Sequence, residues 1–152
     1  MICKAEKEDV KRVYELICDM EQSTLPYGEF ERIFLAQLED GDYCCLVCRR
    51  EGEPVAVLNL RFEEQLHHAG KIAEVMELAV DGRYRNRGLG RELLERACAL
   101  AKERRCMQIE LACNQLRRDA HRFYLRQGMS CCHYKFSRSL TEEGPGENRL
   151  GR

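Results

Sequence analysis

Apolar residues recur along the chain in two spacings, one typical of helices and one typical of strands. Steps of three and four from Val10 to Met20 predict a helix whose first turn is capped by Glu8 or Asp9. Runs rich in apolar residues predict strands, and Gly, Pro and polar clusters mark the breaks. The expected elements are a short strand at 1–5, helices at 10–20, 29–39, 89–104 and 119–126, and strands at 43–49, 54–62, 71–80, 108–113 and 129–139.

This order of elements predicts one α/β (α+β) domain over residues 1–140, built as a mixed sheet with helices on both faces. The first two long strands form a hairpin, and polar residues 63–70 form a loop before the third core strand. Gly128 is expected to end the last helix. Residues 141–152 have no apolar face and contain three glycines, so they are expected to form a disordered tail.

Charge and hydropathy limit the classes of function. The chain has 25 Lys and Arg against 26 Asp and Glu, a net charge of -1, which argues against a general nucleic-acid binder. No apolar run approaches the roughly 18 residues of a membrane-spanning helix. The charges among the first residues argue against a signal peptide. We therefore expect a cytoplasmic protein that binds neither nucleic acid nor membrane.

Ten cysteines are a high count for a chain of 152 residues. Cys45 and Cys48 have CxxC spacing, but residues three apart on a strand face opposite sides, which makes a poor ligand pair. The adjacent pairs at 44–45 and 131–132 suit neither a disulfide ladder nor a zinc finger. We expect small core side chains in a reducing compartment. The alternative is a zinc or redox module.

The most informative stretch is residues 85–91, between a predicted strand and a predicted helix. Such a loop points backbone N–H groups at one spot, and the helix N-terminus adds about half a positive charge. Gly88 and Gly90 let an anion approach the backbone closely. The surrounding arginines are Arg83, Arg85, Arg87 and Arg91. The stretch predicts a pyrophosphate site, although it matches neither the dinucleotide-binding nor the P-loop motif.

Two motifs resemble those of the GCN5-related N-acetyltransferase (GNAT) superfamily. Arg85 to Gly90 resembles its R/Q-x-x-G-x-G/A motif, and Ala120 to Met129 resembles its second signature. Residues 119–126, 66–68, 74, 77–78 and 133–136 further resemble the bacterial aminoalkylphosphonate N-acetyltransferases. The resemblance implies the GNAT fold, a mixed and mostly antiparallel central sheet flanked by about four helices. It also implies acetyl transfer from acetyl-CoA to the primary amine of a small molecule.

The resemblance implies roles for three catalytic candidates. Glu74 or Glu77 is expected to remove a proton from the acceptor amine, with Glu74, acting through water, favoured. The two carboxylates face opposite sides of a regular strand, and the bulge typical of the superfamily would change this. Tyr124 is implied as the acid beside the CoA sulfur. The alternatives are surface or ion-paired carboxylates and a core tyrosine.

Acetyl-CoA is expected to lie along the third core strand and the arginine-rich loop. The pantetheine arm would pair with the backbone of Leu78, Ala79 and Val80, and Asn114 would add a side-chain contact. The pyrophosphate would bind Arg85, Asn86, Arg87, Gly88, Leu89, Gly90 and Arg91. Arg117 stands where the superfamily often has Asn, which puts one pantetheine contact in doubt and offers a charge to the acceptor.

On the acceptor side, a phosphonate favours Arg, His or a divalent ion as partner. The main candidates are His67, His68, Arg117 and Tyr134, with Arg118 and Arg61 as further ones. The alternative for the histidine pair is an ordinary solvated loop. A divalent metal and a homodimer are left open. Other hypotheses are a GNAT enzyme for a polyamine, an amino acid or a protein N-terminus, and a non-catalytic acetyl-CoA-binding regulator.

Overall fold

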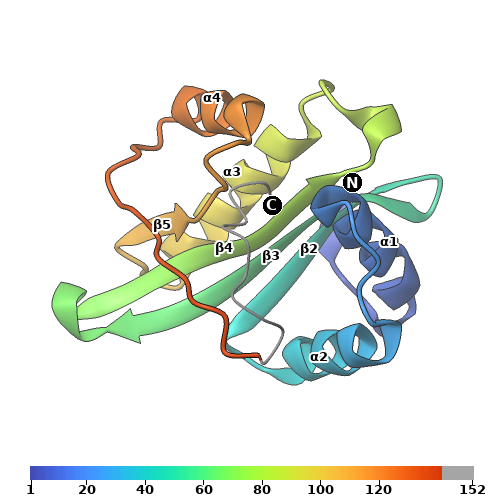
Figure 1. Ribbon diagram of the computed structural model, residues 1–152, viewed down its shortest axis with the longest axis horizontal. Helices are drawn as coiled ribbons and strands as arrows, with labels where there is room; N and C mark the ends of the chain where they lie inside the picture. Colours follow the sequence, from blue (N-terminus) through green and yellow to red (C-terminus); the bar gives the residue numbers. More distant parts are fainter. Residues whose placement is uncertain (142–152) are drawn as a thin grey trace. The chain divides into compact units, whose positions relative to one another are not determined.

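A computed structural model describes residues 1–141 of the chain (Figure 1). The described chain divides into two compact units, the first spanning Met1–Leu111 and the second beginning at Ala112. The first unit contains β1 (Ile2–Lys4), α1 (Val10–Glu21), α2 (Tyr27–Glu39), β2 (Tyr43–Arg50), β3 (Glu53–Gln65), β4 (Gly70–Val80), α3 (Leu89–Glu103) and β5 (Gln108–Leu111), and the second contains α4 (Arg118–Arg126). Within residues 1–141, no helix combines the length and the apolar composition needed to cross a membrane.

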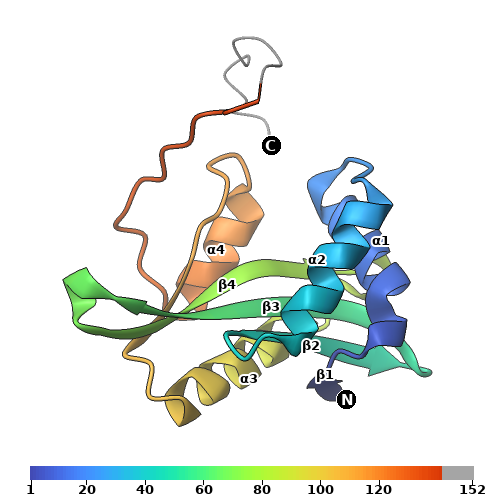
Figure 2. The ribbon, with the colours of Figure 1, turned by 90° about the horizontal axis from the view of Figure 1, so that it is seen from below.

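The five strands form one sheet in the order β1-β2-β3-β4-β5. Neighbouring strands are antiparallel, except that β5 runs parallel to β4. Figure 2 shows α1 and α2 on one face of this sheet and α3 on the other. The mixed, mostly antiparallel sheet with helices on both faces is therefore confirmed.

Strand alternation divides the core between the two faces. Val47 and Val57 point toward α1 and α2, where they belong to one buried cluster with Leu16. Their neighbours Leu58 and Leu60 point to the opposite face, which α3 covers, and both are fully buried. Both faces of the central strands are thus mainly apolar, so a polar side chain at a buried position there needs a specific partner.

Asp9 anchors the start of α1 to the sheet. It occupies the predicted cap position, but its carboxylate does not cap the helix. It accepts hydrogen bonds from the backbone N–H of Glu6 at 2.8 Å and from both terminal nitrogens of Arg49 at 2.6 and 2.7 Å. Asp9 is only 5% exposed, so this ion pair is largely shielded from water.

Replacing Asp9 by alanine is expected to lower the free energy of unfolding by about 3 kcal/mol, because it leaves a half-buried guanidinium without its partner. Urea unfolding followed by circular dichroism measures this. The control is Lys7→Ala, which removes an exposed ion pair to Glu39 at 3.6 Å and is expected to change stability by less than about 1 kcal/mol. Equal stability of the two variants would contradict the role of Asp9.

The predicted loop at 63–70 is wrong, because β3 continues to Gln65 and β4 begins at Gly70. The extension is a polar hairpin in which Glu63 pairs with Ile72 and Glu64 pairs with Lys71. The opposite charges of Glu64 and Lys71 on facing strands stabilise the second of these pairs, whereas Ile72 belongs to the buried core. Figure 1 shows the hairpin as a long arm of the sheet.

The predicted strand at 129–139 is also wrong. Gly128, with φ +83°, ends α4 as expected, and no strand follows it up to residue 141. Tyr134 is 83% exposed and Phe136 is 92% exposed. An alternating pattern becomes a strand only when a neighbouring strand pairs with its backbone, and no such pairing is formed here by the described residues. The expected tail lies outside the described residues except for Thr141.

Candidate active site

A one-residue bulge in β4 determines where its two carboxylates point. Arg61 of β3 pairs with Glu74 and Asn59 pairs with Glu77, so Met76 is an extra residue on β4. Arg61 and Asn59 are two apart on β3 and share a face, and the bulge therefore brings both glutamates to that face. It is the face covered by α1 and α2, since Asn59 hydrogen-bonds Gln37 of α2. The sheet thus presents two carboxylates side by side.

Glu77 is half-buried and hydrogen-bonded. The side-chain Nδ2 of Asn59 donates to its Oε2 at 3.0 Å. Burial raises the pKa of Glu77, the Asn59 hydrogen bond opposes this, and the negative charges of Glu21 and Glu74 add to the increase. Cys45, opposite Asn59 on β2, has its pKa raised to about 12 by burial, with Glu77 as the next cause. Burial thus makes the Glu77 carboxylate a stronger proton acceptor than an ordinary glutamate, while Asn59 favours its charged form.

Glu74 is held differently. Its Oε2 lies 2.8 Å from Nη2 of Arg61, and the Arg61 guanidinium also lies 3.5 Å from Glu63. The Glu74 side chain is 25% exposed, so this is a partly shielded ion pair. This contact agrees with the alternative interpretation of Glu74, in which it is an ion-paired carboxylate and not the catalytic base.

An open cavity of about 500 Å³ lies where β2 begins and β3 extends beyond it. Arg61, one of its lining residues, sits two positions along β3 from Asn59. The other lining residues are Asp40, Asp42, Tyr43, Phe62, Glu63, Glu64 and Lys71. Four carboxylates against two cations make this cavity acidic, which favours a ligand carrying an ammonium group.

Beyond the bulge, β4 loses its partner on one side. β5 pairs with β4 only from Ile72 to Val75, so residues 77–80 pair with β3 alone (Figure 1). The N–H of Asp81 bonds to β3, and strand alternation therefore turns the backbone groups of Leu78 and Val80 to the open edge. Ala79 points its backbone to β3. The Val80 carbonyl accepts from Nε of Arg85 at 3.3 Å.

The loop after β4 has the geometry of an anion cradle. Asn86 and Gly88 have positive φ values of 59° and 81°, and α3 begins at Leu89. The first N–H groups of a helix have no partner within the helix. Among the described residues, no backbone acceptor is taken by the N–H groups of residues 85–91. Those groups are thus free to bind an anion at the positive end of α3.

The arginines of this loop differ in their partners. Arg83 lies 2.9 Å from Asp81, Arg85 lies 3.3 Å from Asp19, and Arg91 lies 2.9 Å from Glu95. Arg83, and to a lesser extent Arg12, holds the pKa of Asp81 well below its usual range. Arg87 instead stacks over Tyr84, its guanidinium carbon 5.4 Å from the ring centre, and no described carboxylate pairs with it. Its charge is available to a ligand.

In the second unit, Tyr124 lies on α4. Burial raises its pKa and the nearby Cys113 adds to this, whereas the positive charge of Arg117 acts in the opposite direction. The phenol therefore stays protonated at neutral pH and can donate a hydrogen bond. Phe123 packs edge-to-face against its ring, with the centroids 5.2 Å apart.

Asn114 forms the turn that leads into α4. Its Oδ1 accepts from the N–H of Leu116 at 2.9 Å, and its backbone oxygen lies 2.7 Å from Nε2 of His121. Within the described residues its amide nitrogen has no hydrogen-bond partner. The predicted contact residue is thus fixed in place while its donor stays available.

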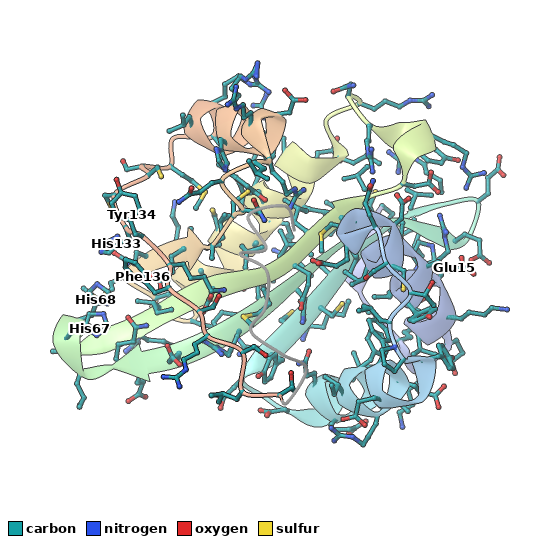
Figure 3. The ribbon with its side chains drawn as sticks, in the orientation of Figure 1. Glu15, His67, His68, His133, Tyr134 and Phe136 are labelled. Atoms are coloured by element: carbon teal, nitrogen blue, oxygen red, sulfur yellow. The ribbon has the colours of Figure 1, made fainter. Side chains whose placement is uncertain are left out.

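His67 and His68 lie at the tip of the β3–β4 hairpin, in the short turn Leu66–His68 (Figure 3). Their ring centres are 4.3 Å apart, and Nδ1 of His68 lies 2.6 Å from Oε1 of Gln65. Tyr134 belongs to the second unit and is exposed. Across residues 1–141, no three His, Cys, Asp or Glu side chains gather as a metal site would require.

The thiols follow the expectation only in part. Cys44 and Cys48 are buried, whereas Cys131 and Cys132 are exposed, so the core prediction is wrong for that pair. Cys45 pairs with Asn59 and Cys48 with Ala56, which places the two CxxC thiols on opposite faces as predicted.

The sequence did not predict two residues of the site, Asn59 and Gln37. The available signal was a single amide within the apolar run of residues 54–60. Gln37 offered no signal, because its contact with Asn59 joins residues 22 positions apart.

The family model described as "Acetyltransferase (GNAT) family" matches residues 10–129, so the chain belongs to the GNAT acetyltransferases. It is 38% identical over 136 residues to the aminoalkylphosphonate N-acetyltransferase of Salmonella typhimurium, covering 90% of this chain and 88% of that protein. Family membership makes the chain an N-acetyltransferase, with acetyl-CoA as the acetyl donor and a small amine as acceptor.

Solved structures share the fold. A transcriptional regulator from Bacillus halodurans C-125 matches with a TM-score of 0.85 at 24% identity, over 92% of this chain and 99% of that one. Glucosamine-6-phosphate N-acetyltransferase from Arabidopsis thaliana matches with a TM-score of 0.77 at 25% identity, over 93% and 98%. The expected GNAT fold is confirmed.

Proposed function

We propose that this protein transfers the acetyl group of acetyl-CoA to the primary amine of an aminoalkylphosphonate, by direct attack on the thioester. The observation that carries the chemistry is Glu77, a half-buried carboxylate with a raised pKa whose hydrogen-bond donor Asn59 lies two positions along β3 from Arg61, a lining residue of the acidic cavity. The acceptor rests on the 38% identity to the Salmonella enzyme.

In the proposed reaction Glu77 takes a proton from the ammonium of the acceptor, directly or through water. The freed nitrogen attacks the thioester carbon, the C–S bond breaks, and the departing thiolate of CoA receives a proton from Tyr124. Glu77 is preferred over Glu74 because the latter is already engaged by Arg61 at 2.8 Å. A raised pKa brings a carboxylate closer to the range in which it is an effective base at neutral pH.

The acetyl donor is proposed to bind along the open edge of β4. The outward backbone groups of Leu78 and Val80 would pair with the pantetheine arm as an added strand. The free N–H groups of residues 85–91 would hold the pyrophosphate at the start of α3. Asn114, with its unpartnered amide nitrogen, would add a side-chain contact.

Arg87→Ala is expected to raise the KM for acetyl-CoA about tenfold with little change in kcat, because it removes a charge-assisted contact to the donor. Calorimetric titration with CoA checks this directly. The charge-matched control is Arg96→Ala on α3, the helix that follows the loop, where the Arg96 guanidinium lies 3.9 Å from Glu103. Unchanged CoA affinity in Arg87→Ala would exclude this arginine from the pyrophosphate site.

The charge of the cavity favours a second candidate, acetylation of a polyamine. Its lining carries Asp40, Asp42, Glu63 and Glu64. Carboxylates attract the extra ammonium groups of a polyamine, whereas they repel a phosphonate unless a cation intervenes. Arg61 and Lys71 are the cations of this lining, and Arg61 is shared with Glu74.

The test incubates the protein with acetyl-CoA and a mixture of amines, and identifies the acetylated products by mass spectrometry. The mixture contains aminomethyl- and aminoethylphosphonate, spermidine, amino acids and a peptide, with and without a divalent cation. A thiol reagent is avoided, because the ten cysteines of the protein would react with it.

An acetylated aminophosphonate as the main product would support the proposal, and a requirement for the cation would place a metal between phosphonate and carboxylates. Acetylated spermidine as the main product would replace it by the second candidate. CoA binding without any product would contradict both and favour a regulator.

A further inference from the structure

The amide of Asn59 connects α2, β3 and β4 around the candidate base. Its Nδ2 lies 2.9 Å from Oε1 of Gln37 and 3.0 Å from Oε2 of Glu77. An amide nitrogen has two hydrogens, and both are used here. Asn59 can therefore serve Glu77 only as a donor, which favours the charged carboxylate.

Gln37 fixes the orientation of this amide. The Oδ1 of Asn59 is buried and has no hydrogen-bond partner among the described residues. A buried acceptor without a donor is unfavourable, and such groups are rare in native proteins. The two hydrogen bonds that Nδ2 donates thus compensate for the unpartnered Oδ1 and hold the amide in this orientation. Gln37 of α2 supplies one of the two acceptors.

None of the other described groups around Glu77 stabilises its charged form. Glu21 at the end of α1 and Glu74 on β4 both disfavour its charge. The Cys45 thiol on β2 is partly buried and stays protonated because its pKa is raised, and Gln37 of α2 is neutral. Arg61 on β3 forms its ion pairs with Glu74 and Glu63.

We propose that Asn59, oriented by Gln37, is a positioning residue that holds the Glu77 carboxylate at the acceptor face and keeps it ionised for proton abstraction. This inference rests on the proposed function, because it presumes that Glu77 is the base. It explains why an amide interrupts the apolar strand between Leu58 and Leu60, both fully buried.

The test compares Asn59→Leu with the wild type in two measurements. Carbon-13 NMR of glutamate carboxyls, with Glu77→Gln to assign the signal, gives the pKa of Glu77 in the free protein. The pH dependence of kcat/KM, with the best substrate of the amine mixture, gives the pKa that controls the rate. Both are expected to rise by about one unit, since a donor to the charged form is lost.

Gln37→Leu provides a second variant that leaves Asn59 in place, and it carries the test if Asn59→Leu does not fold. Its expected shift has the same direction and is smaller, because the amide keeps its bond to Glu77 but is free to rotate. The matched control is Gln108→Leu on β5, an exposed position at which no shift is expected.

The results separate the two claims. A parallel upward shift in both measurements supports the inference. An unchanged Glu77 pKa in folded Asn59→Leu overturns it, even if Glu77→Gln is inactive. A shifted Glu77 pKa with an unshifted rate profile overturns the catalytic role of Asn59 and also removes Glu77 as the base.

Discussion

Acetylation by a Glu77→Gln variant is expected to fall about 10²- to 10³-fold at neutral pH, with little change in acetyl-CoA binding. Glutamine keeps the size of the side chain and its contact with Asn59, but it cannot accept the amine proton. In the wild type, kcat/KM is expected to fall as the pH drops through the pKa of Glu77. That limb lies above the ordinary range of a glutamate, because burial raises this pKa.

The companion variant is Glu74→Gln, which breaks the ion pair to Arg61 and leaves Glu77 intact. Product formation, followed by mass spectrometry, is expected to change by less than about tenfold. If Glu74→Gln loses most activity while Glu77→Gln keeps it, then Glu74 is the base, acting through water as the sequence analysis favoured.

Tyr124→Phe is expected to lower kcat about 10²-fold, within the usual range for a general acid, and to leave the KM for acetyl-CoA within about threefold. The ring still packs on Phe123, so the variant loses only the proton donor. Because burial raises the pKa of Tyr124, the wild-type phenol stays protonated at alkaline pH. The rate is therefore expected to hold until the pH exceeds the ordinary pKa of tyrosine, about 10.

The control for this variant is Tyr27→Phe on α2, which removes a surface hydrogen bond to Glu31 at 3.0 Å. Single-turnover measurement of acetyl transfer separates the chemical step from product release. Equal rates for Tyr124→Phe and Tyr27→Phe would remove Tyr124 from the chemistry and assign it to packing.

Local signals predicted the arginine-rich loop and the helix after it. The glycines and the apolar spacing of residues 89–104 are close together in the chain, so the sequence alone predicts a helix that begins at Leu89. Prediction was weaker at the hairpin, because its extension to Gln65 depends on pairing between polar residues, which an apolar pattern does not report.

The surroundings of Glu77 depend on contacts between distant segments. A bulge shows no local sequence signature, and only the resemblance to GNAT enzymes suggested one in β4. The pairing of Asn59 with both Gln37 and Glu77 arises when a helix and two strands meet. The residues after Met129 alternate in polarity but do not form a strand. A strand also needs a neighbouring strand to pair with, and the local sequence does not show whether one is present.

Met76 constrains how this active site can change during evolution. Its side chain is 39% exposed, so many residues can replace it. Its presence as one extra residue, however, sets which face of the sheet Glu77 occupies, because side chains alternate with a period of two. Deleting it would turn Glu77 toward the apolar side under α3 and place an unpaired charge in the core. Position 76 therefore tolerates substitution but not deletion. Single-residue insertions or deletions in β4 are expected to be eliminated by selection.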